Sequence, residues 1–231
     1  MTVTKQTYET RKAEVDLSCD MLTVFEGQYN DENRIFDRTQ VEKFTPILKS
    51  NILLMLYNLV ESTVLNGIEE IYDRLKSHAT TYSNVRNEIK DIWFSYRFKQ
   101  AYGPTAHYES YERKAREIVD SIIQGKHIEL NKKALPLSGN VDADMIRRIC
   151  SDHGITFTAD NACNGGERLK EIKTKRNELA HGTVSFAECG RDRTVQDIIE
   201  IKEQTYSFLD GLISGMEQYY NENRYYVNAE T

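Results

Sequence analysis

The stretch "PILKSNILLMLYNLVESTVLNGIEEIYDRLKS", residues 46–77, has almost no polar break before Asn58, Glu61 and Asn66. The pair Thr45–Pro46 is typical of an N-cap followed by proline at the first helical position, and it predicts where this helix begins. A helix that is apolar nearly all round belongs in the centre of a bundle. We therefore take residues 46–77 as the spine of the fold.

Amphipathic patterns on both sides of the spine predict further helices. Their ranges are about 5–28, 82–100, 108–124, a short helix at 141–153 closed by Gly154, 167–181, and a last long helix from Thr194 to about 222. Most of the remaining residues in 126–166 have no period. The sequence predicts an all-α helical bundle with long central helices, an irregular insert at about 126–166, and a single domain over 1–231.

Composition narrows the functional classes. The 231 residues include only 3 Pro and 12 Gly, which favours long helices, and the net charge of −6 argues against a general nucleic-acid coat. Four widely spaced cysteines and dispersed histidines predict neither a zinc site nor disulfides, and no cofactor is expected. We expect surface or capping positions for His78, His107, His127 and His153. No apolar leader or membrane-length segment occurs, so we predict a soluble, cytoplasmic protein.

The segment "KEIKTKRNELAHGTVSF", residues 170–186, carries the candidate site. Helical packing explains Ile172, Leu179 and Ala180, together with Leu169 just before the segment, and Gly182 is a natural left-handed cap. Packing does not explain Arg176, Asn177 and His181. Arginine binds phosphate oxygens, histidine can move the proton of a ribose hydroxyl, and asparagine can hold a phosphate, a hydroxyl or the imidazole. The alternative is that cationic side chains in a last turn only complement the helix dipole.

Further charges surround this segment. Residues 167–176 hold five positive and two negative side chains, a local excess of +3 in an acidic chain. We predict RNA-binding roles for four of the cations: Arg168, Lys170, Lys173 and Lys175. The alternative is a solvated helix face. Glu61 interrupts the apolar spine and needs a partner if it is buried. It either forms a structural hydrogen bond or ion pair, or orients Arg176 or His181.

These segments resemble one protein family. "RNELAHG", residues 176–182, resembles the R-x(4–6)-H signature of HEPN-domain ribonucleases, including the polar residue Asn177 after Arg176. Residues 53–75 resemble the apolar second helix of MAE-type prokaryotic HEPN proteins. Residues 137–155 resemble a segment that such proteins carry before the motif helix.

The resemblance implies an all-α fold that forms a homodimer in which two motif helices face one another. Each copy would lend Arg176, Asn177 and His181 to one composite site that cleaves RNA without a metal ion, by attack of the ribose 2′-hydroxyl on the adjacent phosphate. It implies a toxin or anti-phage effector acting on RNA, tRNA included, with an antitoxin or co-encoded defence protein as partner. Thr183 stands where some members carry a modified tyrosine, which argues against control by a partner nucleotidyltransferase.

Two other functions stay open. The first is a non-catalytic HEPN-type helical module that binds nucleic acid, nucleotide or a partner protein. The second is an antitoxin-like or scaffolding bundle that binds no RNA. An intact titratable His181 favours the enzyme, because a binding module has little use for it.

Overall fold

The computed structural model describes residues 1–99, 108–137 and 139–227. Within these ranges there are eight α-helices and no β-strand, so the predicted all-α fold is confirmed. The helices are α1 (Thr2–Gly27), α2 (Arg38–Ser77), α3 (Asn87–Lys99), α4 (Tyr108–Ile123), α5 (Ala143–His153), α6 (Glu167–Ala180), α7 (Phe186–Arg191) and α8 (Val195–Asn221).

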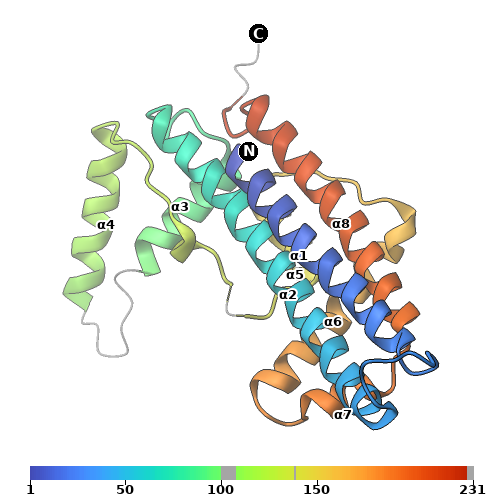
Figure 1. The fold of residues 1–231 in the computed structure, drawn as a ribbon. Helices are drawn as coiled ribbons and strands as arrows, with labels where there is room; N and C mark the ends of the chain where they lie inside the picture. Colours follow the sequence, from blue (N-terminus) through green and yellow to red (C-terminus); the bar gives the residue numbers. More distant parts are fainter. Residues whose placement is uncertain (100–107, 138, 228–231) are drawn as a thin grey trace.

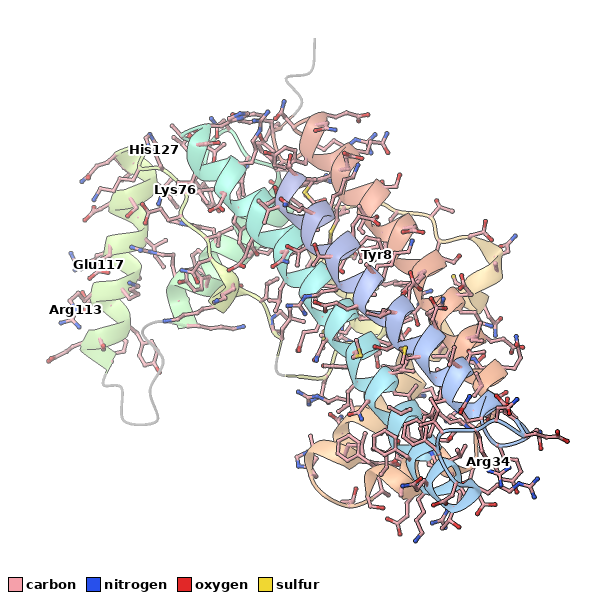
Figure 2. All side chains as sticks on the ribbon, in the orientation of Figure 1. Tyr8, Arg34, Lys76, Arg113, Glu117 and His127 are labelled. Atoms are coloured by element: carbon pink, nitrogen blue, oxygen red, sulfur yellow. The ribbon has the colours of Figure 1, made fainter. Side chains whose placement is uncertain are left out.

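Helix α2 is the spine that the sequence predicts. It lies beside α1 and α8 as one of three long helices (Figure 1), and it also contacts α6 and α7. Many of its apolar side chains are fully buried, among them Leu53, Leu56, Leu59 and Ile68. Tyr8 of α1 points toward α8, where its hydroxyl donates to Asp210 at 2.7 Å (Figure 2). No described helix has a stretch both long and apolar enough to cross a membrane.

The start of α2 differs from the prediction. The helix begins at Arg38, and Pro46 lies inside it. Asp37 and Gln40 form a reciprocal capping box, in which each side chain accepts from the other's backbone N–H, at 2.9 and 3.0 Å. This box satisfies the free N–H groups of the first turn, so the helix starts there. Pro46 removes one backbone donor without ending the helix.

Helices α3 and α4 form an arm at one edge of the molecule. They lie beside each other, apart from the three long helices, and α4 turns Arg113 and Glu117 outward (Figures 1 and 2). The Phe98 and Tyr111 rings stack between them with centroids 6.0 Å apart. The predicted end of this helix, at about residue 100, falls outside the described residues, and α3 begins at Asn87 rather than at about residue 82.

The insert and the C-terminal part complete the bundle. The predicted irregular insert contains the short 3-10 helices η1 (Lys132–Ala134) and η2 (Asn161–Gly166) around α5, which closes at left-handed Gly154 as predicted. The short helix α7 was not predicted from the sequence. Thr194 is the N-cap of α8. Tyr219, near the end of α8, and Tyr225, just after it, are both buried in the core.

Candidate active site at the end of α6

Helix α6 has a short apolar face and a defined end. Leu169 and Ile172 are each 1% exposed. At the other end Gly182 has φ 67°, and its N–H donates to the Leu179 carbonyl at 3.2 Å. The Thr183 N–H donates to the Glu178 carbonyl at 3.0 Å. This pair of bonds is a Schellman motif, so the predicted cap at Gly182 is confirmed.

Arg176 is held by two distant parts of the chain. Its guanidinium lies over the Tyr57 ring of α2, with Cζ 4.8 Å from the ring centroid. Its Nη1 donates to the Gly139 carbonyl at 3.1 Å and to Oδ1 of Asn177 at 3.0 Å. Within the described chain no hydrogen bond engages Nε or Nη2. Those two donors are therefore available to a phosphate.

Gly139 lies against the edge of this guanidinium. A methyl group on Gly139 would come within 2.9 Å of Nη1 and 3.0 Å of Nη2 of Arg176. Its φ of 76° is also a left-handed value that glycine adopts without strain. Both the backbone conformation and the close approach favour glycine at this position.

The Tyr57 hydroxyl joins α2 to the insert. It donates to Oε1 of Glu61, one turn further along α2, at 3.4 Å, and it accepts from the Val141 N–H at 3.3 Å. Burial raises the pKa of Tyr57, so its hydroxyl is protonated at neutral pH. Half-buried Glu61 therefore reaches Arg176 through Tyr57. Its orienting role stays a prediction, now with an indirect path.

Asn177 and His181 take different positions. The Asn177 Nδ2 donates to Oδ1 of Asn140 at 2.8 Å, while His181 is the C-cap residue of α6 and is exposed. Among the described residues, no hydrogen bond or ion pair joins the imidazole to Arg176 or Asn177. Five helical steps place Arg176 and His181 about 140° apart around the axis. One chain thus turns Arg176 toward the bundle and His181 toward solvent.

The four cations predicted to bind RNA are mostly engaged within the chain. Three form ion pairs: Arg168 with Glu171 at 2.9 Å, Lys175 with Glu178 at 2.8 Å, and Lys173 with Asp142. Only Lys170 has no ion-pair partner among the described residues. Because Asp142 and Glu178 lie outside the counted segment, the local positive excess is smaller than the sequence predicts.

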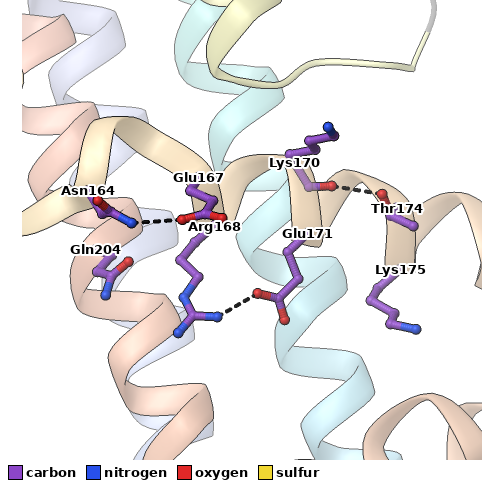
Figure 3. A pocket seen from close by; sticks show the side chains of 8 residues that line it. All are labelled: Asn164, Glu167, Arg168, Lys170, Glu171, Thr174, Lys175 and Gln204. Carbon is purple, nitrogen blue, oxygen red and sulfur yellow. Dashed lines mark hydrogen bonds and ion pairs between the residues drawn. The ribbon is translucent and has the colours of Figure 1, made fainter.

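A groove of about 410 Å³ follows these charges along α6. It runs from Asn164 past the Arg168–Glu171 pair to Lys175, with Gln204 of α8 on its other side (Figure 3). Lys170 extends its ammonium group away from that ion pair (Figure 3). Charged and polar side chains line the groove, and its acids and bases neutralise each other in part.

Sequence reasoning missed Tyr57, Gly139 and Asn140. Tyr57 precedes Glu61 by one turn, and Gly139–Asn140 is a recognisable turn signal. Neither signal says that these residues contact Arg176 and Asn177, because the contacts join segments that are far apart in the sequence.

The structure also corrects the expectation for His153, which is 3% exposed and whose Nε2 lies 2.7 Å from the Tyr72 hydroxyl. His107 lies outside the described residues. No three described His, Cys, Asp or Glu side chains are grouped to hold a metal ion.

Comparison with known proteins adds one finding. The family model described as HEPN_MAE_28990-like HEPN matches residues 5–225, a range that includes α6 and every residue around Arg176 described above. No curated protein and no solved structure gives a significant match.

Proposed function

Because the chain belongs to the HEPN family, we propose that it is a metal-independent endoribonuclease that acts as a toxin or anti-phage effector. Family membership alone supports a nuclease-like or nucleotide-binding helical module. The observation that carries the finer proposal is Arg176, fixed over Tyr57 with Nε and Nη2 unengaged, on the same helix end as exposed His181.

The proposed reaction needs only these side chains and RNA. The ribose 2′-hydroxyl attacks the adjacent phosphorus while a His181 imidazole accepts its proton. The bond from phosphorus to the 5′-oxygen breaks, and that oxygen takes up the proton that the His181 imidazole had accepted, which returns the imidazole to its neutral form. The products are a 2′,3′-cyclic phosphate and a 5′-hydroxyl. Arg176 stabilises the charge that develops on the phosphorane, and Asn177 helps to hold Arg176 through its Oδ1.

The site is proposed to form between two copies of the chain. Within one chain, Arg176 and His181 point to different sides of α6, so a single copy does not bracket one phosphate with both. A second motif helix facing the first would bring the imidazole of one copy toward the guanidinium of the other. It would also place two copies of Lys170 beside one cleft.

The test compares variants with matched controls on α4 and just after it. Arg176→Ala and His181→Ala are expected to abolish RNA cleavage measured with EDTA present. Arg113→Ala and His127→Ala remove exposed side chains of the same types far from α6, and they are expected to cleave like the wild type. Cleavage that appears only on adding a divalent metal would refute the mechanism. Growth arrest that persists on expressing His181→Ala would refute the site.

Mixing the two inactive variants tests the shared site. If each copy lends groups to one cleft, a mixture of Arg176→Ala and His181→Ala chains forms mixed dimers that retain one arginine and one histidine. Partial cleavage is expected from the mixture and none from either variant alone. A chain that is monomeric by light scattering while it cleaves RNA would contradict the proposal.

The ion pairs of the cations give the alternative function its best support. With Lys173 and Lys175 engaged internally, the face attracts phosphate less strongly than their number predicts. A non-catalytic helical module that binds a co-encoded partner protein fits that face, whereas one that binds nucleic acid or nucleotide would depend on Lys170 and Arg176. Saturable RNA binding by the wild type without any cleaved ends would favour this alternative.

A further inference from the structure

We propose that Tyr57 is a positioning residue that presets Arg176 for the phosphate. The kinetic part of this inference rests on the proposed ribonuclease function. The structural part, that Tyr57 determines where the Arg176 guanidinium lies, can be tested without any activity.

The first observation is the stacked contact itself. The Arg176 Cζ is 4.8 Å from the Tyr57 ring centroid, and the ring is 1% exposed at the centre of α2. A cation over the face of a desolvated aromatic ring is attracted by the ring quadrupole. Because the ring belongs to the buried spine, it is a fixed platform for a long, flexible side chain.

The second observation is that Tyr57 also holds the other support of Arg176. Its hydroxyl accepts from the Val141 N–H at 3.3 Å, two residues after Gly139. The Gly139 carbonyl in turn accepts from Nη1 of Arg176 at 3.1 Å. One side chain therefore supplies the face beneath the guanidinium and tethers the turn that contacts its edge.

The third observation concerns what is left free. The ring takes one face of the guanidinium, and Gly139 and Asn177 take Nη1. In the described chain, Nε and Nη2 have no acceptor, and these are adjacent donors with the spacing for a bidentate phosphate contact. The contacts of Nη1 and of one guanidinium face therefore orient Nε and Nη2. Preorganised donors of this kind contribute more to the transition state than to substrate binding.

The experiment separates the ring from the hydroxyl. Tyr57→Phe removes only the hydroxyl, whereas Tyr57→Leu removes the aromatic face. Tyr72→Leu is the matched control, because Tyr72 is another buried tyrosine of α2 that does not touch Arg176. Should Tyr57→Leu fail to fold, Tyr57→Met fills more of the space without an aromatic face and takes its place.

The first readout is the ¹H–¹⁵N resonance of the Arg176 side chain, assigned by its loss in Arg176→Lys. It is expected to show a ring-current shift in the wild type, Tyr57→Phe and Tyr72→Leu, and to lose that shift in Tyr57→Leu. A resonance that does not move in Tyr57→Leu would overturn the positioning role, whether or not the protein cleaves RNA.

The second readout is kinetic. Tyr57→Leu is expected to lower kcat about tenfold with little change in KM, because a misplaced group costs mainly transition-state stabilisation. The same replacement is then made in a chain that already carries Arg176→Ala, or Arg176→Lys if Arg176→Ala has no measurable activity. There Tyr57→Leu should lower kcat much less than tenfold. Equal losses in both backgrounds would mean that Tyr57 acts only on the fold. A wild type that never cleaves would refute the proposed function and leave the resonance test standing.

Discussion

Replacing Gly139 by alanine tests the edge contact of Arg176, and Gly125→Ala is its natural control. Both glycines have left-handed φ, 76° and 61°. A left-handed alanine costs about 1–2 kcal/mol, and the stiffer unfolded chain returns about 0.4–1 kcal/mol. Each variant should therefore lose about 1 kcal/mol of unfolding free energy. At Gly125 no atom lies within 4 Å of the new methyl group.

The two variants should differ in what happens to Arg176. At Gly139 the methyl group would lie 2.9 Å from Nη1, against 3.4 Å for ordinary contact. The guanidinium is the free end of a flexible side chain, so it moves aside at little cost in stability. A shift of a catalytic group toward 1 Å costs up to about a hundredfold in rate, so we expect about a tenfold loss of RNA cleavage.

Urea unfolding and initial cleavage rates measure the two effects separately. Similar unfolding free energies with reduced cleavage only in Gly139→Ala are the expected result. If the two variants cleave RNA equally well, the contact between Gly139 and Arg176 does not serve the reaction. A loss of stability much larger at Gly139 than at Gly125 would show that Arg176 cannot move aside, which would refute the reasoning.

Three further predictions concern stability and RNA affinity. Burial lowers the pKa of His153 below its unfolded value of about 6.5. Because the unfolded chain therefore binds the proton first as pH falls, the free energy of unfolding should decrease below about pH 6.5. Urea unfolding at pH 7.5 and 5.5 measures this decrease. Gly190→Ala would place a methyl 2.0 Å from the Pro46 carbonyl oxygen, where backbone cannot yield, and we expect a loss of about 1–3 kcal/mol in the same assay. Lys170→Ala should weaken RNA binding more than Lys173→Ala, whose ammonium is already ion-paired, and filter binding at two salt concentrations tests this.

Local signals predicted most of the helices. Gly154 and Gly182 end α5 and α6 as expected, because a left-handed glycine closes a helix whatever surrounds it. The start of α2 was mistaken because two valid signals compete, and the Asp37 capping box lies upstream of Pro46. Helix α7 was missed because six residues are too few for a periodic pattern.

The candidate site was predictable only in its residue types. The motif Arg176, Asn177 and His181 can be read directly from the chain, since spacing along one helix is a local property. The charge of its surroundings was overestimated, because Asp142 comes from the loop before α5 and pairs with Lys173 across the fold.

The sequence by itself determined an all-α bundle around an apolar spine, and a helix end that carries Arg176 and His181. Both follow from periodicity and capping, which involve neighbours a few residues apart. Only the tertiary structure decided that Tyr57 lies beneath Arg176 and Gly139 at its edge. Those contacts depend on how α2, the insert and α6 pack together, and packing between distant segments leaves no period in the chain.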